Sequence, residues 1–228
     1  MAELTRKAEP ELMDLDDEVE AYARADFAEV NQRFVDQLMD LSKGLTGRGA
    51  PSTRAVDLGT GPGDIPIRVA KARPQWQISA VDASAPMLDV ARAAIAKAGV
   101  STITLVLADA KATNLPPTSF DVIFSNSILH HVSDPLAFWR EVKRVAKPGA
   151  TVLIRDLFRP ASEAAARNLV TLHAGTESKL LQEEFYRSLL SAYTVSEVRA
   201  QLKQCGIGGL EVAEISDRHL DIFGTLEA

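Results

Sequence analysis

The sequence predicts an α/β protein with a doubly wound, mostly parallel sheet and an antiparallel last strand. Between residues 54 and 154, short apolar segments alternate with helical ones, which is typical of repeated βαβ units. The expected strands are continuous apolar runs, as in strands that are buried on both faces of a sheet. Only Ser216-Asp217-Arg218 separates the last two expected strands. So short a link forms an antiparallel hairpin and cannot form a parallel crossover.

The composition fits one globular domain. The chain has 228 residues, of which 46% are hydrophobic and 25% charged. The net charge of −6 weighs against a nucleic-acid partner, whose phosphates require a basic surface. No apolar run approaches the ~20 residues that span a bilayer, and the start of the chain has no apolar signal-peptide segment. We therefore expect no membrane partner. Because Cys205 is the single cysteine, we expect a cytoplasmic protein without an internal disulfide.

The first 49 residues precede the alternating pattern. Residues 1–13 are expected to form a poorly ordered leader. An amphipathic helix is expected from Asp16 to Leu41, because apolar residues recur there at helical spacing. Several glycines and Pro51 follow and end this helix.

Strands and helices alternate after residue 50. Five strands are expected at residues 54–58, 77–82, 103–107, 121–125 and 151–154. The helices between them begin near Asp64, after a cap at Ser84 and after a cap at Asp134. Lys147-Pro148-Gly149 is expected to make the turn into the fifth strand.

The alternation stops after Asp156. A helical insertion is expected at residues 157–192, where no strand pattern is present. Thr194 and Glu197 then have the spacing of a capping box at the start of a helix. Two closing strands are expected around residues 210–215 and 219–223.

A glycine-rich turn gives the strongest functional signal. The run Asp57-Leu58-Gly59-Thr60-Gly61-Pro62-Gly63-Asp64 joins the first strand to the first helix, where ligands of open α/β sheets bind. Asp64 occupies the position of the third glycine in the dinucleotide motif Gly-x-Gly-x-x-Gly. Carboxylates at Asp57 and Asp64 favour a cationic ligand over a pyrophosphate, so an NAD-linked oxidoreductase is disfavoured. An ordinary strand-to-helix turn is the alternative.

Two further carboxylates end the next strands. Asp82 follows the second strand and is suited to accept hydrogen bonds from two ribose hydroxyls, as the acidic residue of dinucleotide folds does. Asp109 follows the third strand and is suited to accept from an exocyclic adenine amine, with the amide of Ala110 beside it. The alternative for both is a structural role as turn or cap residues.

The motif set resembles a known family. The turn at residues 56–63, Asp82, Asp109, the run Phe120-Asp121-Val122-Ile123-Phe124-Ser125 with His130-His131, and the turn Lys147-Pro148-Gly149 resemble class I S-adenosylmethionine (SAM)-dependent methyltransferases. The nearest resemblance is to the small-molecule branch that includes ubiquinone/menaquinone-type enzymes, and it covers about residues 50–156. It implies a Rossmann-like seven-stranded sheet with an antiparallel last strand.

The resemblance also implies a cofactor and its site. SAM is expected as cofactor and S-adenosylhomocysteine (SAH) as product, with the three glycines around the methionine part, Asp82 at the ribose and Asp109 at the adenine. The expected cofactor-binding residues are Asp57, Gly59, Thr60, Gly61, Gly63, Asp64, Asp82, Ala83, Met87, Asp109, Ala110 and Ser125. Residues 1–49 would be a leader and lid helix, and residues 50–228 the methyltransferase domain with its insertion at about 157–192.

His130 and His131 are the candidate catalytic residues. An acceptor such as a phenol, thiol or enol has to lose a proton, and a histidine near a strand end suits that task. A structural role for both histidines remains equally open. Arg155-Asp156 ends the fifth strand and would either hold an anionic group or form an ion pair. No Glu-x-x-His or His-x-x-His spacing is present, so no metal site is expected.

The function expected from these residues is methyl transfer from SAM to a small-molecule acceptor. The run after the fourth strand lacks the Asn/Asp-Pro-Pro-aromatic pattern of DNA amino-methyltransferases. A protein or peptide methyltransferase and a SAM-binding regulator without catalysis remain as alternatives. The sequence leaves the acceptor atom open, and it does not decide between a monomer and a homodimer.

Overall fold

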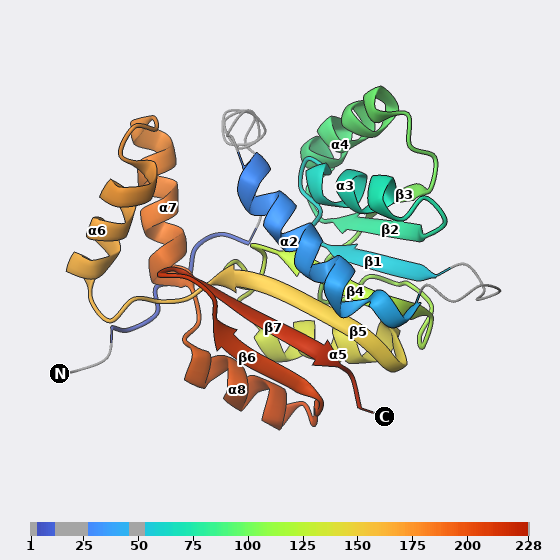
Figure 1. Ribbon diagram of the computed structural model, residues 1–228. Helices are drawn as coiled ribbons and strands as arrows, with labels where there is room; N and C mark the ends of the chain where they lie inside the picture. The colour runs from blue at the N-terminus through green and yellow to red at the C-terminus, as the bar shows by residue number, and fades with distance from the viewer. Residues whose placement is uncertain (1–3, 12–26, 46–52, 228) are drawn as a thin grey trace.

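A single seven-stranded sheet forms the centre of the computed structural model, which describes residues 4–11, 27–45 and 53–227 (Figure 1). Its strand order is β3-β2-β1-β4-β5-β7-β6. The strands are β1 Arg54–Leu58, β2 Gln77–Asp82, β3 Ile103–Leu107, β4 Phe120–Asn126, β5 Ala146–Leu157, β6 Leu210–Glu214 and β7 His219–Thr225. β7 lies antiparallel between β5 and β6, and the pairs among β1 to β5 are parallel. The predicted fold class is confirmed.

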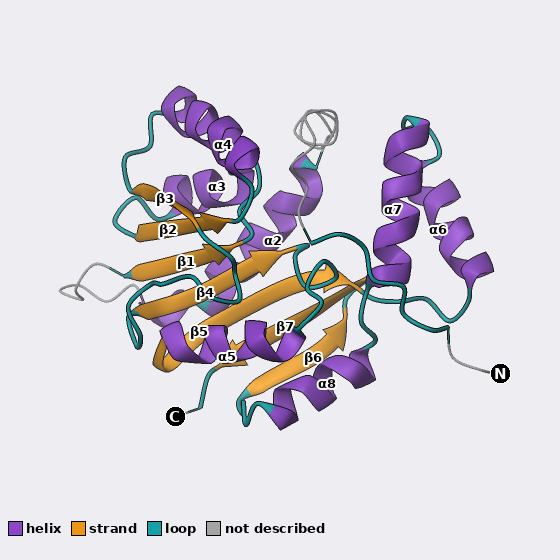
Figure 2. Cartoon of the chain, turned by 180° about the vertical axis from the view of Figure 1, so that it is seen from behind, coloured by secondary structure: helices purple, strands orange, loops and turns teal. Residues whose placement is uncertain are grey.

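Helices cover both faces of the sheet (Figure 2). They are α2 Ala28–Leu41, α3 Asp64–Ala72, α4 Ala85–Ala98, α5 Pro135–Val145, α6 Glu163–Ala174, α7 Lys179–Ser191 and α8 Val195–Gln204, with a short 3₁₀ turn η1 at Lys43–Leu45. On one face α5 and α8 pack around Phe138 and Trp139, both fully buried. On the other face α2 and α3 pack around Phe34 and Trp76. The sheet is therefore buried on both sides, as its continuous apolar strands require.

Local capping explains why the helices begin where they do. The Ser84 hydroxyl accepts from the backbone N–H of Met87 at the start of α4, and the Asp134 carboxylate accepts from Ala137 at the start of α5. Thr194 forms the predicted capping box at α8 with its partner three residues later. These three predictions are confirmed.

The fifth strand is longer than the sequence predicts. It begins at Ala146 rather than residue 151, and the predicted turn Lys147-Pro148-Gly149 lies inside it. The pairing of β4 with β5 shifts between Phe120–Ala146 and Val122–Thr151, and Gly149 has a φ of 79° at this irregularity. The turn residues therefore form a bulge in a strand and do not precede it.

The structure of the N-terminal segment differs from the leader that the sequence predicts at residues 1–13. Residues 4–11 pack against the end of α7 and are not a poorly ordered leader: the Lys7 N–H donates to the Leu190 carbonyl (3.0 Å) and the Glu9 N–H to the Ser191 hydroxyl (3.3 Å). The helix expected from Asp16 is confirmed for Ala28–Leu41, and its first half lies outside the described residues. None of the described helices is long and apolar enough to cross a membrane.

The expected helical insertion is present as α6 and α7. The two helices pack on each other around Leu189 and Ala166 and stand at one end of the sheet, beside the carboxyl end of β5 (Figure 1). The N-terminal segment runs along the base of this pair. The insertion and the N-terminal segment thus meet at the sheet edge where parallel strands end.

Candidate functional site

The glycine turn after β1 has backbone angles at which a residue with a Cβ would be strained. Gly59, Gly61 and Gly63 have φ values of 75°, 53° and 84°, a region that favours glycine. A Cβ on Gly59 would lie 2.5 Å from Cδ1 of Ile128. The N–H groups of Gly59 and Thr60 both donate to the Val81 carbonyl, at 2.8 and 2.9 Å. The turn is therefore fixed to the end of β2 and packed by the loop that follows β4.

Asp82 lies beside this turn with its carboxylate held from two sides. Its Oδ2 accepts from the Gly61 N–H at 2.7 Å, and its Oδ1 accepts from the Ser84 N–H at 2.9 Å. Burial raises the pKa of Asp82, while these backbone bonds lower it in part. Because each carboxylate oxygen has a second lone pair, the group is oriented and can still accept hydrogen bonds from a diol.

Asp57 is buried beneath the turn. It is 2% exposed, and Oδ2 accepts from the Thr60 hydroxyl at 2.7 Å. Burial raises its pKa to about 7, against the effect of the Thr60 bond, and the charge of Asp82 adds to the rise. A buried carboxylate that is hard to ionise gains stability when a cation approaches. The carboxylates at the turn therefore fit a positively charged ligand.

The other predicted cofactor residues divide into two groups. Asp109 lies at the same sheet edge as Asp82 and accepts from the N–H of Lys111 at 2.7 Å. Asp64 is turned to the helices instead, with Oδ2 2.7 Å from Arg68 and 2.9 Å from Asn31. Of the remaining residues, Ser125 in β4 donates its hydroxyl to the Leu58 carbonyl (2.6 Å), Met87 in α4 and Ala110 after β3 are buried, and Ala83 after β2 is half-buried.

The loop after β4 brings a second group of polar residues to this edge. Nδ1 of His130 lies 2.5 Å from Oδ1 of Asp156, at the end of β5, and His130 is 4% exposed. Oδ2 of the same carboxylate accepts from the N–H of Leu129 at 2.5 Å. Burial lowers the pKa of His130, but the carboxylates of Asp156 and Glu9 outweigh it and raise that pKa overall.

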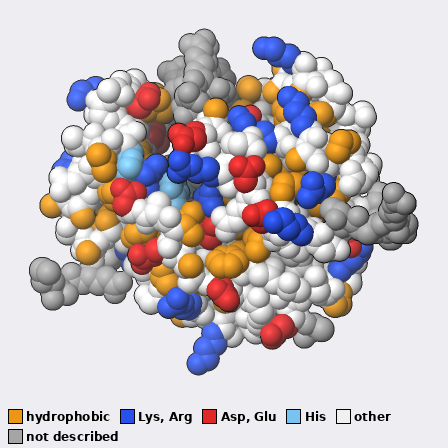
Figure 3. All heavy atoms as spheres, in the orientation of Figure 1, with side chains coloured by type: hydrophobic (Ala, Val, Ile, Leu, Met, Phe, Trp, Pro, Cys, Tyr) orange, Lys and Arg blue, Asp and Glu red, His pale blue; other side chains and the backbone are white. Residues whose placement is uncertain are grey.

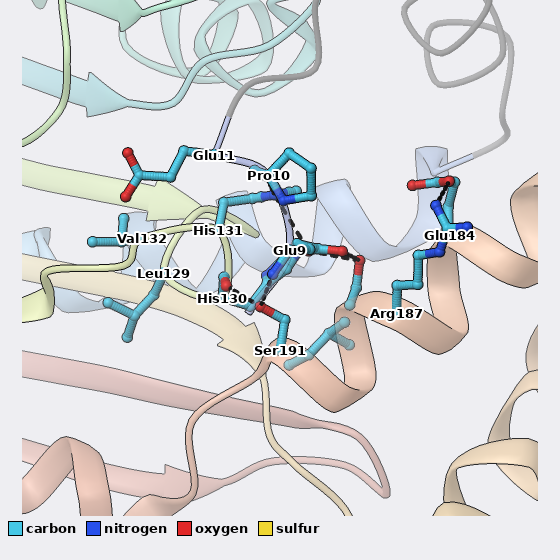
Figure 4. A network of polar contacts seen from close by, with 12 residues as sticks. Glu9, Pro10, Glu11, Leu129, His130, His131, Val132, Glu184, Arg187 and Ser191 are labelled. Carbon is cyan, nitrogen blue, oxygen red and sulfur yellow. Dashed lines mark hydrogen bonds and ion pairs between the residues drawn. The ribbon is translucent and has the colours of Figure 1, made fainter. Parts of the chain in front are cut away.

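Glu9 completes this group from the N-terminal segment (Figure 4). Its Oε1 lies 3.5 Å from Nε2 of His130 and 3.3 Å from Nδ1 of His131. Burial, together with the neighbouring His130, lowers the pKa of His131 to about 3, although nearby carboxylates oppose this. The predicted histidines are therefore together, and Glu9 is a residue that the sequence analysis missed. Its local sequence carries no motif, because its contacts lie far along the chain.

The structure decides between the two roles that the sequence allows for Arg155, an anion-binding side chain or a member of an ion pair. Its Nε and Nη2 donate to the two oxygens of Asp221 on β7, at 2.7 and 2.9 Å, and Nη2 also donates to Gln37 of α2. The side chains of the ion pair are 6% and 0% exposed. Arg155 is thus an internal ion-pair partner, and it joins β5 to β7.

The glycine turn with its carboxylates and the cluster of Glu9, His130, His131 and Asp156 lie next to each other at the end of the sheet where the parallel strands finish. Ile128, whose side chain packs against Gly59, is two residues before His130. On the face shown in Figure 3, histidine, acidic and basic side chains gather between the α6–α7 pair and the sheet. The arrangement can hold a cationic nucleoside at the turn and place a second molecule toward the histidines.

Comparisons with known proteins agree with this geometry. Residues 56–154 match the model of a methyltransferase domain. The chain is 36% identical over 107 residues to a demethylmenaquinone methyltransferase of Roseiflexus castenholzii, covering 47% of this chain and 44% of that protein. It is 25% identical over 194 residues to a 27-O-demethylrifamycin SV methyltransferase of Amycolatopsis mediterranei, covering 84% of this chain and 65% of that protein. The chain thus spans less than two thirds of either relative.

The fold is shared with solved structures. A SAM-dependent methyltransferase from Aquifex aeolicus superposes with a TM-score of 0.69 at 20% identity, over 92% of this chain and 97% of that one. At this identity the likeness is one of fold. It includes the elements on both sides of the matched domain, because nearly the whole chain is covered.

Proposed function

The chain belongs to the class I SAM-dependent methyltransferases, and from this we propose that it transfers the methyl group of SAM to a small-molecule acceptor. The observation that carries the proposal is the glycine turn with positive φ angles, with Asp82 fixed beside it and Asp57 buried beneath it. A carboxylate at Asp57 suits a cofactor whose sulfur and amino group are positive and disfavours a pyrophosphate, whereas an acidic residue at Asp82 is compatible with either kind of cofactor.

The turn and the strand ends would hold the cofactor. Gly59, Gly61 and Gly63 would enclose the methionine part, Asp82 would accept from the ribose hydroxyls, and Asp109 with the Ala110 amide would face the adenine. When bound, SAM supplies an electrophilic methyl group on a positively charged sulfur, and SAH is the product. Ala83, Met87 and Ser125 are proposed as walls of the same site. Asp57, with Thr60, would stabilise the positive charge from below, whereas Asp64 pairs with Arg68 and is not proposed to contact the cofactor.

His130 and His131 are proposed to face the reacting atom of the acceptor. They lie beyond Ile128 from the glycine turn, and Asp156 fixes the orientation of the His130 ring. The N-terminal segment and the α6–α7 pair would form the walls that exclude water and align the acceptor with the methyl group. Such alignment alone lowers the barrier of a displacement reaction by several kcal/mol, on the order of 7–11 in favourable cases.

Two relatives support a small acceptor: one is a demethylmenaquinone methyltransferase and the other a 27-O-demethylrifamycin SV methyltransferase. The second relative is matched over the insertion as well as the domain, since the match covers 84% of this chain. We therefore propose an acceptor of this general kind, a multi-ring compound with a hydroxyl or an activated ring carbon.

Two measurements test the proposal. Calorimetry with SAM and SAH is expected to show one binding site, and incubation with a panel of quinols, phenols and polyketides is expected to release SAH with at least one of them. Absence of SAM binding would refute the proposal. SAM binding with transfer only to proteins or peptides, or with no transfer at all, would support instead one of the two alternatives, a protein methyltransferase or a regulator.

A further inference from the structure

Three side chains that could ligate a metal meet at the acceptor side of the site: Glu9 from the N-terminal segment and the adjacent His130 and His131 from the loop after β4 (Figure 4). Oε1 of Glu9 is 3.5 Å from Nε2 of His130 and 3.3 Å from Nδ1 of His131. One ligand atom from each of the three residues lies within 4.8 Å of the others. Ligands that share a tetrahedral ion at about 2.0–2.1 Å are about 3.3 Å apart. The two distances from Glu9 are therefore already close to those that a bound ion requires.

The His130 ring is oriented as in many metal sites. Its Nδ1 is 2.5 Å from Oδ1 of Asp156, and the N–H groups of Leu129 and Leu157 hold the two oxygens of that carboxylate. With the proton on Nδ1, the lone pair of Nε2 points toward Glu9. Metal-ligating histidines commonly donate their other ring N–H to a carboxylate, which fixes the tautomer and strengthens the ligand. Asp156 supplies that second contact here.

Glu9 is also held in place. The Ser188 hydroxyl donates to its Oε1 at 3.2 Å, and its N–H donates to Ser191, whose hydroxyl in turn donates to the His130 carbonyl at 2.5 Å. The Glu9 side chain is 7% exposed. The ligand is therefore pre-organised by contacts with α7.

Two buried carboxylates flank the histidines, and the guanidinium of Arg6 is directed to backbone carbonyls. Glu9 and Asp156 have side chains 7% and 2% exposed. Arg6 directs its guanidinium to the carbonyls of His130, Val132 and Ser191 and stacks on the Tyr193 ring. A divalent cation between Glu9 and the histidines would offset the concentrated negative charge, which is costly to bury.

The ligand types select a class of ion. Two imidazoles and one carboxylate suit zinc and its first-row neighbours, whereas magnesium and calcium prefer sets of oxygen ligands. Three protein ligands also correspond to catalytic sites, which leave a position for an exogenous ligand.

We propose that Glu9, His130 and His131 bind a divalent transition-metal ion of the zinc class, with one coordination position left for an oxygen of the acceptor. The role toward the acceptor rests on the proposed function; the binding of the ion does not. An ion there would orient an acceptor hydroxyl toward the glycine turn and ease the loss of its proton to solvent. The acceptor oxygen would then form its bond to the methyl carbon while the sulfur keeps the electron pair of the broken bond.

The test is metal binding by the full chain after treatment with a chelator. Titration with Co²⁺ is expected to produce the visible absorption of a low-symmetry site at one ion per chain, and Zn²⁺ is expected to displace it. Glu9→Gln keeps the shape of the side chain and should weaken binding by about tenfold or more, and Asp156→Asn should weaken it by about 10–100-fold through the second contact. His173→Gln is the matched control, because His173 also pairs with a carboxylate, Asp217, and should leave binding unchanged.

The outcomes separate the two proposals. No stoichiometric Co²⁺ binding by the wild type, or equal binding by Glu9→Gln, overturns the metal site, and circular dichroism of each variant guards against misfolding. SAM calorimetry on the same samples reports the proposed function independently. Methyl transfer that persists in chelator, without metal binding, would mean that the histidines act on the acceptor without an ion.

Discussion

The N–H of Gly61 donates to Oδ2 of Asp82 at 2.7 Å, so one hydrogen bond joins the glycine turn to the end of the second strand. The same carboxylate caps the N–H of Ser84 at the start of α4. Asp82 therefore sets the distance between the parts of the site that are proposed to hold the methionine and ribose ends of SAM.

Replacing Asp82 with alanine is expected to weaken SAM binding by about tenfold or more. The change would remove the charge-assisted hydrogen bonds that Asp82 is proposed to make to the ribose, and it removes the bond from the Gly61 N–H that holds the turn. Calorimetry with SAM measures the loss. Asp89→Ala is the matched control, since Asp89 is an exposed residue of α4 that pairs with Arg92. Equal affinity of the Asp82 variant and wild type would remove Asp82 from the site.

Replacing Gly59 with alanine should both destabilise the protein and reduce SAM binding. The φ of 75° costs about 1–2 kcal/mol for a residue with a Cβ, and the new methyl would meet Cδ1 of Ile128 at 2.5 Å. Urea unfolding gives the loss of stability. Gly44→Ala is the control, because a Cβ there meets nothing within 4 Å.

A second change separates strain from contact at the same position. Adding Ile128→Ala to Gly59→Ala removes the side chain that the new methyl would strike, so part of the lost stability should return. The loss of stability that Gly59→Ala causes in the Ile128→Ala background then reports the backbone strain, because Ile128→Ala alone has its own cost. If Gly59→Ala costs the same in the wild-type and Ile128→Ala backgrounds, the contact with Ile128 is unimportant.

Local signals explain how much of the fold could be predicted from the sequence. The caps at Ser84 and Asp134 are decided by residues within one helical turn, so their pattern is sufficient. The start of β5 was missed because Pro148-Gly149 has the composition of a turn, whereas its pairing across a bulge depends on β4. Elements decided by local chemistry were predicted, and an element decided by its neighbour was not.

The candidate site also contains residues that local motifs predict and residues that only distant packing brings in. Asp57, the glycines and Asp82 were found because a contiguous motif and strand ends place them together. Glu9 was missed because it lies in a segment without periodicity, and only the packing of that segment on α7 brings it to His130. An ion pair was one of two roles that the sequence allowed for Arg155-Asp156, but the partner of Arg155, Asp221, lies in the closing hairpin and could not be identified from the local sequence.

The pKa of Asp57 predicts a pH dependence of stability. Folding raises this pKa to about 7, mainly by burial, from an unfolded value near 3.9. The unfolded chain therefore loses the proton first as pH rises. The contribution of Asp57 to stability is complete below pH ~4 and is lost as pH rises toward about 7, at about 1.4 kcal/mol for each pKa unit at most.

The measurement is urea unfolding between pH 4.5 and 8 for wild type and Asp57→Asn. The wild type should lose stability relative to the variant across this range, because the amide cannot ionise. A constant difference between the two proteins would show that Asp57 is ionised in the folded state throughout. Asp64→Asn is the control, because the Asp64 side chain is 45% exposed and forms an ion pair with Arg68.

The buried ion pair of Arg155 and Asp221 predicts a large, asymmetric effect of mutation. Replacing Arg155 with methionine leaves the Asp221 carboxylate unpaired in a site where it is 0% exposed, so the free energy of unfolding should fall by about 3–5 kcal/mol. Adding Asp221→Leu removes the uncompensated charge and should restore most of the loss, since apolar replacements of buried pairs are often near neutral. Urea unfolding of the two variants measures both effects. If the double variant is as unstable as Arg155→Met, the pair contributes through its geometry, including the bond from Arg155 to Gln37 of α2, and not through charge compensation alone.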